Sequence, residues 1–178
     1  MRTLFDLKEY LTQMILIGIG GNLPTKKFGS PLRSLKAAIV AINESVCDVI
    51  RCSPWYQSTP LPISSQPNFF NAVAEVKTEL TPIILLSRLQ EIEKQFERVR
   101  TGPNAPRSLD LDLLIYHQCV FNVNKGTKLV LPHARMHLRA FVLFPLRDLE
   151  PEWIHPTKHR SINRLINDLS SDQKCWKF

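Results

Sequence analysis

The strongest constraint on the fold is the run RSLDLDLLIY at residues 107–116. Its strict alternation of leucine and aspartate predicts a β-strand with the leucines on one face. Asp110 and Asp112 then share the other face, about 7 Å apart. Aspartate is unfavourable in strands, so this pair indicates either a solvated sheet face or two oxygen ligands for Mg²⁺, which prefers carboxylates together with substrate phosphates. Arg107, directly upstream, offers a bidentate phosphate-binding group for such a site.

The length of 178 residues predicts one domain with enough chain to bury a core. We expect this domain to occupy residues 14–178, because the first apolar run begins at Met14. Residues 1–13 carry several charges and lack the apolar stretch of a signal peptide. We interpret them as an N-terminal extension, which is either peripheral to the domain or a result of start-site choice.

The net charge of +7 suits an anionic partner, either a nucleic acid or a polyphosphate, and does not distinguish between them. The four cysteines form no C-x-x-C pair and have no histidines at zinc-binding spacing, which is typical of reduced cytoplasmic thiols. No apolar run is long enough to span a membrane. The composition therefore favours a cytoplasmic protein that has no membrane partner.

Hydrophobic periodicity predicts the element order β-α-β-β-α-β, followed by an appended hairpin and helices. This order is the split βαβ, or ferredoxin-like, unit, and it predicts an α+β fold with a mostly antiparallel sheet and helices on one face of that core. The expected strands are 14–19, 46–58, 69–79 and 109–113; the expected helices are 31–42, 82–99, 139–149 and 161–169, with a hairpin over 117–131.

Several stretches of the chain resemble those of the 6-hydroxymethyl-7,8-dihydropterin pyrophosphokinases of folate biosynthesis. The stretches that carry the resemblance keep the family's order: Gly18–Leu23, Tyr56–Leu61 (YQSTPL), Gln66–Ala72 (QPNFFNA), Glu93–Arg100, Ala105–Leu114 (APRSLDLDLL) and Pro132–Phe141. The resemblance implies an ATP-dependent diphosphotransferase that moves pyrophosphate from ATP to the pterin alcohol, giving the pterin diphosphate and AMP. It further implies ATP and the pterin as partners, no nucleic acid, and a monomer or weak dimer.

The resemblance also implies a role for each matching residue. Asp110 and Asp112 match the ligands of two Mg²⁺ ions, and Arg98, Arg100 and Arg107 match catalytic cations beside the ATP phosphates. The remaining ATP-binding positions are Gln90, Glu93, Leu113, His133 and Arg139, and the pterin-binding positions are Ser58, Leu61, Phe69, Asn71 and Phe141.

The sequence departs from the family pattern in three places. Residues 103–106 lack an arginine and a tryptophan that many relatives carry before Gly-Pro-Arg, Ala134 stands where relatives often have tyrosine, and the loop 23–30 is longer than in compact members. Read residue by residue, Phe69 and Phe141 are equally consistent with core aromatics, and the arginines with a solvated helix end.

Two other functions compete with this one. A ferredoxin-like sheet with aromatics and a basic charge is also typical of an RRM, although the RNP signature is missing and two aspartates on the sheet repel a phosphate backbone. A D-x-D nucleotide-sugar transferase is the second alternative, for which the chain is short.

Overall fold

The computed structural model describes residues 13–99, 101–121 and 129–178. Three predicted features lie outside these ranges: residues 1–12 of the N-terminal extension, Arg100, and the turn of the hairpin. Within them, no helix is long and apolar enough to cross a bilayer. The elements in chain order are β1 (Ile15–Gly21), α2 (Pro31–Ser45), β2 (Asp48–Cys52), β3 (Tyr56–Ser58), β4 (Phe69–Lys77), α3 (Pro82–Gln95), β5 (Asp110–Tyr116), the short 3-10 helix η1 (Met136–Leu138), α4 (Ala140–Leu149), α5 (Ile162–Asn167) and β6 (Cys175–Lys177).

The strands form one antiparallel sheet in the order β5-β1-β4-β3-β6, and β2 also pairs with β4. Helix α2 connects β1 to β2, and α3 connects β4 to β5, so each helix crosses over one intervening strand. This is the split βαβ arrangement. The predicted α+β, ferredoxin-like fold is confirmed.

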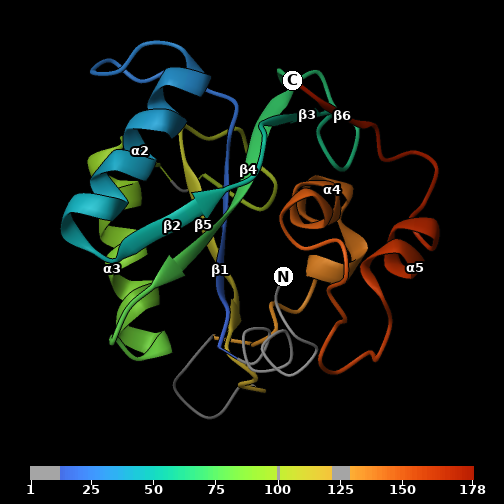
Figure 1. The fold of residues 1–178 in the computed structure, drawn as a ribbon. Helices are drawn as coiled ribbons and strands as arrows, with labels where there is room; N and C mark the ends of the chain where they lie inside the picture. Colours follow the sequence, from blue (N-terminus) through green and yellow to red (C-terminus); the bar gives the residue numbers. More distant parts are fainter. Residues whose placement is uncertain (1–12, 100, 122–128) are drawn as a thin grey trace.

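Helices cover both faces of the sheet (Figure 1): α2 and α3 lie on one side, and α4 and α5 on the other. The alternation within single strands explains why. Ile17 of β1 and Ala74 of β4 belong to the core under α2 and α3, whereas their neighbours Leu16 and Val73 belong to the core under α4. Because these central strands are apolar on both faces, each face needs a covering layer. The prediction of helices on one face is therefore incomplete, because α4 and α5 cover the second face.

The predicted strand 46–58 is interrupted at Ser53. Its hydroxyl accepts a hydrogen bond from the backbone N–H of Val73 at 3.0 Å, and its own N–H donates to the Val73 carbonyl at 2.9 Å. The next residue, Pro54, has no N–H to donate to β4. β2 and β3 therefore flank this break and pair with successive parts of β4.

Helix α3 ends at Gln95, earlier than the predicted end at Val99. Glu97 has a φ of 61°, a left-handed conformation that stops the helix, and its carboxylate accepts two bonds of 3.2 Å from the Lys26 N–H. Val99, predicted on the buried stripe, is 70% exposed. The early stop lets Arg98 turn back toward β5, where it serves the site described below.

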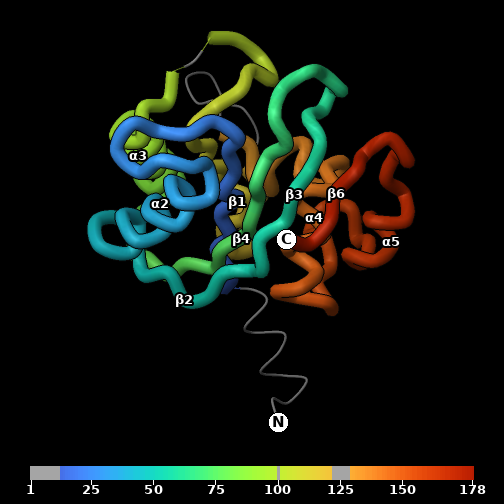
Figure 2. Tube along the Cα trace, turned by 90° about the horizontal axis from the view of Figure 1, so that it is seen from above, coloured from blue at the N-terminus to red at the C-terminus, as the bar shows by residue number. Residues whose placement is uncertain are grey.

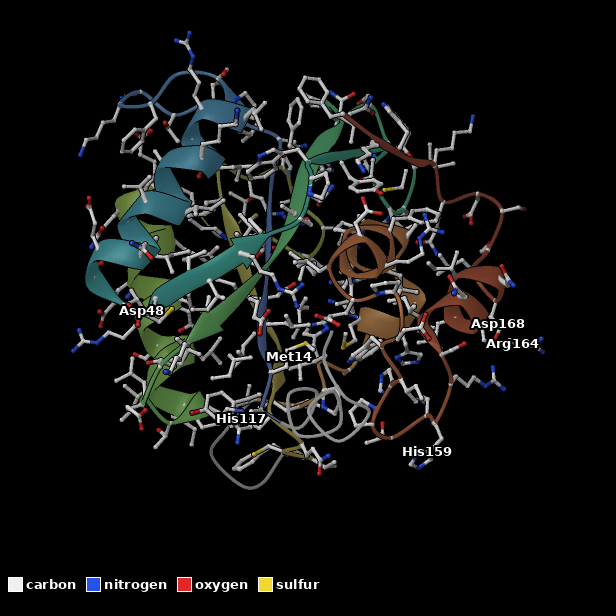
Figure 3. All side chains as sticks on the ribbon, viewed as in Figure 1. Met14, Asp48, His117, His159, Arg164 and Asp168 are labelled. Carbon is white, nitrogen blue, oxygen red and sulfur yellow. The ribbon has the colours of Figure 1, made fainter. Side chains whose placement is uncertain are left out.

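The far end of β1 is closed by the residue after β5. His117 donates its backbone N–H to the Met14 carbonyl at 2.7 Å, and its Nδ1 lies 2.6 Å from the carbonyl oxygen of Gln13. Figure 3 shows Met14 and His117 at this end of the sheet, and Met14 itself is buried in the core under α4. Each of the four cysteines, all in the described ranges, is a free thiol.

Candidate functional site

Three adjacent strands bring Asn71, Gly20 and Asp110 into one row across the sheet. Gly20 of β1 pairs with Asn71 of β4 on one side and with Asp110 of β5 on the other. Directly opposed residues of antiparallel strands point to the same face, so an amide and a carboxylate flank a position that has no side chain. A Cβ at position 20 would lie only 3.0 Å from Asn71 Oδ1. Gly20 thus leaves open floor between two polar groups.

This row forms part of the floor of a cleft of about 1200 Å³, bounded by η1, the start of α4 and the loops 59–62 and 101–107. Figure 2 shows these loops at the same end of the sheet. The volume exceeds the ~300–1,000 Å³ of a typical single-ligand pocket. Every predicted site residue that the structure describes lines the cleft, namely Ser58, Leu61, Phe69, Asn71, Gln90, Glu93, Arg98, Arg107, Asp110, Asp112, Leu113, His133, Arg139 and Phe141.

Asp110 is held between two arginines. Arg98 Nη1 lies 2.5 Å from Asp110 Oδ1, and Arg107 Nη1 lies 2.5 Å from Oδ2. Arg98 also donates to the Leu109 carbonyl at 2.6 Å. The site therefore concentrates positive charge beside its first carboxylate.

Glu93, predicted to bind ATP, has a supporting position. Glu93 is 3% exposed, and its carboxylate accepts a 2.8 Å hydrogen bond from the Leu111 N–H and lies 3.5 Å from Arg98 Nη1. Glu93 thus fixes both β5 and the arginine that contacts Asp110. Leu113 likewise packs its side chain in the core under α2 and α3, so its backbone is the part available to the cleft.

Asp112 is in a different environment from Asp110. Among the described residues it forms an ion pair with Arg139, whose Nη1 lies 3.5 Å from Asp112 Oδ2. Burial, and then the negative charge of Asp110, raise the pKa of Asp112. Two carboxylates on one strand face, one of them destabilised in its charged form by the other, suit a divalent cation that relieves this repulsion.

A metal at this point would not be enclosed by protein ligands. The described residues contain no cluster of three or more histidine, cysteine, aspartate or glutamate side chains that would hold an ion. Mg²⁺ commonly binds one or two carboxylates and completes its shell with water and substrate phosphates. The donors present therefore fit Mg²⁺ bound together with a polyphosphate.

Each aromatic of the predicted pterin pair lies against an arginine. The Arg107 guanidinium is 5.5 Å from the centre of the Phe69 ring, and the Arg139 guanidinium is 5.3 Å from that of Phe141. Both distances are within the range of cation–π attraction. Arg107 and Arg139 thus each contact both a carboxylate and an aromatic ring.

The side-chain amide of Asn71 is held in place by Ser58. Its Nδ2 donates to the Ser58 hydroxyl at 3.0 Å, and both residues are almost fully buried. Because a buried amide with one firm partner has few alternative orientations, Ser58 sets how Asn71 faces the cleft. Leu61 lies at the rim, 38% exposed.

His133 is oriented by hydrogen bonds from its backbone and its ring. Burial lowers its pKa, its backbone N–H donates to the Leu114 carbonyl at 2.8 Å, and its Nδ1 accepts a weaker bond of 3.3 Å from the Arg135 N–H. The ring proton therefore resides on Nε2, as a donor. Arg135, which lines the cleft beside it, is a further candidate phosphate contact that the sequence analysis did not select.

Asn22 is a second residue missed from the sequence. It is 2% exposed, and its Oδ1 accepts from the Arg107 N–H at 2.9 Å while its Nδ2 donates to the Pro67 carbonyl at 3.0 Å. Gln66 extends the same connection by donating to the Asn104 carbonyl at 3.0 Å. Asn22 thus joins the end of β1 to both loops of the cleft, and its only sequence signal is a polar residue following a buried strand.

The RRM alternative is not supported. An RRM stacks nucleotides on an open sheet face, whereas here α4 packs on that face over Val73 and Leu114. Phe69 and Phe141 line the enclosed cleft at its edge and do not form an open platform.

A family model described as 7,8-dihydro-6-hydroxymethylpterin-pyrophosphokinase (HPPK) matches residues 16–151. The 2-amino-4-hydroxy-6-hydroxymethyldihydropteridine pyrophosphokinase of Haemophilus influenzae is 38% identical over 163 residues, covering 91% of this chain and 96% of that protein. The folic acid synthesis protein fol1 of Schizosaccharomyces pombe is 36% identical over 123 residues, 69% of this chain. The chain spans only 16% of the length of that protein.

Among solved structures, a Plasmodium falciparum HPPK-DHPS with pterin and p-hydroxybenzoate superposes with a TM-score of 0.66. The match covers 86% of this chain and 43% of the Plasmodium chain, at 14% sequence identity. At that identity the likeness concerns the fold alone.

Proposed function

This chain belongs to the 7,8-dihydro-6-hydroxymethylpterin-pyrophosphokinase family, and from that membership we propose that it transfers pyrophosphate from ATP to 6-hydroxymethyl-7,8-dihydropterin. The products are AMP and the pterin diphosphate, an intermediate of folate biosynthesis. The proposal includes two Mg²⁺ ions, action in the cytoplasm and a monomer or weak dimer that binds no nucleic acid.

The observation that carries the proposal is the row Asn71, Gly20, Asp110. A pterin has flat faces and one edge of amide-like donors and acceptors, which the Asn71 amide can pair. Above Gly20 a flat ring meets no side chain from β1. Its hydroxymethyl group then extends toward Asp110, where the phosphates and metal are expected.

The protein's part in this reaction is positioning and charge neutralisation, because phosphoryl-type transfer needs little covalent chemistry from side chains. Bound Mg²⁺ would supply positive charge that orients the triphosphate. Asp110 and Asp112 would hold the metal, and Arg98 and Arg107, with Arg100, would stabilise the negative charge on the phosphates.

The aromatic and nucleotide-side residues complete the assignment. Phe69 and Phe141 stack on the two pterin faces, and Ser58 and Leu61 close that end of the cleft. The ATP side is assigned to Gln90, Glu93, Leu113, His133 and Arg139, where the His133 ring donates from Nε2 and Glu93 acts through Arg98.

 The assignment of these ATP-side residues depends on the family resemblance and on their position around the cleft.

A steady-state assay of AMP release tests the proposal. With ATP, Mg²⁺ and the pterin alcohol all present, we expect AMP and pterin diphosphate in equal amounts. Omitting the pterin, or chelating the metal, should abolish both products. Release of ADP in place of AMP, or of AMP without the pterin, would contradict a pyrophosphokinase.

A further inference from the structure

Helix α4 begins without a capping residue of its own. Its N-cap position is Arg139, whose side chain makes no capping hydrogen bond. The N–H of Ala140 is instead satisfied by the C-terminal tail, because Gln173 Oε1 accepts from it at 2.9 Å. A residue 33 positions away in sequence thus replaces the local cap.

The nitrogen of the same Gln173 amide binds Leu138, the residue before Arg139. Gln173 Nε2 donates to the Leu138 carbonyl at 2.9 Å. The two bonds from one side chain therefore flank Arg139 and fix its backbone on both sides. That backbone is extended, with φ −125° and ψ 113°.

This backbone carries two groups of the cleft. Arg139 reaches Asp112 at 3.5 Å and lies 5.3 Å from the centre of the Phe141 ring. Phe141 follows in the first turn of α4. A change in the backbone at the start of α4 therefore moves one wall of the cleft.

The residues after Gln173 contact β3 and the residue that follows it, on the side of the cleft where Asn71 lies. The Lys174 carbonyl accepts from the Thr59 N–H at 3.1 Å, and Cys175 of β6 pairs with Ser58 of β3. In Figure 2, β6 lies alongside β3 with α4 nearby. Because Ser58 orients the Asn71 amide, three successive residues of the tail contact the segments that position Phe141 and Asn71.

We propose that Gln173 is a positioning residue for the pterin pocket, and that the tail sets the separation between Phe141 and Asn71. The inference rests on the proposed function. Gln173 lies outside residues 16–151, the range matched by the family model.

The tail has other attachments that do not involve Gln173. Lys177 Nζ lies 2.9 Å from Asp148 Oδ2, the Phe178 N–H donates to the Trp55 carbonyl at 2.9 Å, and the Phe178 ring packs edge-on against Phe70 at 5.1 Å. Removing the Gln173 amide therefore leaves the tail bound, and it tests the two Gln173 hydrogen bonds separately from the rest of the tail.

The test compares Gln173→Ala with Asp172→Ala, which changes an exposed neighbour in the same tail. We expect Gln173→Ala to weaken binding of the pterin alcohol about tenfold by calorimetry, since it removes two hydrogen bonds, and to speed amide exchange at Ala140. Asp172→Ala should change neither. Gln173→Glu keeps an acceptor for Ala140 and should recover part of the affinity.

The outcomes separate this inference from the proposed function. A wild-type protein that neither binds the pterin nor releases AMP would overturn both. An active wild type whose Gln173→Ala variant keeps its pterin affinity would overturn the positioning role alone. A fall in melting temperature with unchanged affinity and kinetics would make Gln173 merely structural.

Discussion

The guanidinium of Arg107 lies 5.5 Å from the centre of the Phe69 ring, and its Nη1 lies 2.5 Å from Asp110 Oδ2. One side chain therefore links a proposed pterin wall to a proposed metal ligand. Arg139 makes the corresponding link between Phe141 and Asp112. Because each arginine contacts both halves of the cleft, the two substrate sites share supporting groups, which is a physical basis for coupling between them.

Replacing Arg107 with alanine should reduce kcat about ten- to a hundredfold. The expected loss corresponds to about 1.5–3 kcal/mol for a hydrogen bond to a charged group. Arg107→Lys should recover only part of the rate, because lysine lacks the planar fork that binds phosphate and stacks on Phe69. Steady-state kinetics with each substrate varied would check this, and a defect confined to pterin KM would refute a phosphate role.

The two aspartates should respond differently to substitution. Asp112→Asn should lower kcat at least about a hundredfold, since the metal contributes several kcal/mol, and leave the melting temperature unchanged or higher. The reason is that burial and the charge of Asp110 disfavour the Asp112 carboxylate. Asp110→Asn should lower both activity and stability, because it weakens the contacts to Arg98 and Arg107.

Thermal unfolding and AMP release, measured on both variants, provide the comparison. Near-normal turnover of Asp112→Asn in Mg²⁺ would rule out the metal pair. Equal destabilisation by the two substitutions would contradict the difference in their surroundings.

Local patterns were sufficient for part of the site. Alternation alone predicts that Asp110 and Asp112 share a face, because strand periodicity is a property of neighbouring residues. The family resemblance then selects the residues that line the cleft, although it does not reveal that Glu93 is buried behind Arg98.

The features that sequence reasoning missed depend on contacts between distant residues. The end of α3 is fixed by Glu97 accepting from Lys26, 71 positions away, while the apolar stripe continues past it in sequence. Asn22 holds Arg107 across 85 positions. β6 is a three-residue strand without a periodic pattern, so only its pairing with β3 identifies it.

Adding a methyl group at Gly20 should block the pterin without unfolding the protein. A Cβ there would lie 3.0 Å from Asn71 Oδ1, in the space above the sheet floor. We expect Gly20→Ala to weaken pterin binding at least about tenfold. Gly18→Ala is the matched comparison, because the atoms nearest to its Cβ belong to the flexible Leu114 side chain, at 3.4 Å, and it should have the smaller effect. Equal pterin affinity in wild type and Gly20→Ala would place the ring elsewhere.

Stability should rise with pH between about 4 and 6.5 because of His155. This ring is 3% exposed, and burial, with smaller contributions from His137, Lys158 and His159, lowers its pKa from 6.5 to about 4. In that range the unfolded chain binds a proton that the folded chain does not, so acid favours unfolding and the effect is complete above 6.5. His155→Asn keeps an acceptor for the Thr157 N–H but cannot titrate, and should lose part of this slope in urea unfolding measured from pH 4.5 to 7. The exposed His159→Asn should keep the slope, and an unchanged slope in His155→Asn would assign the pH dependence to other groups.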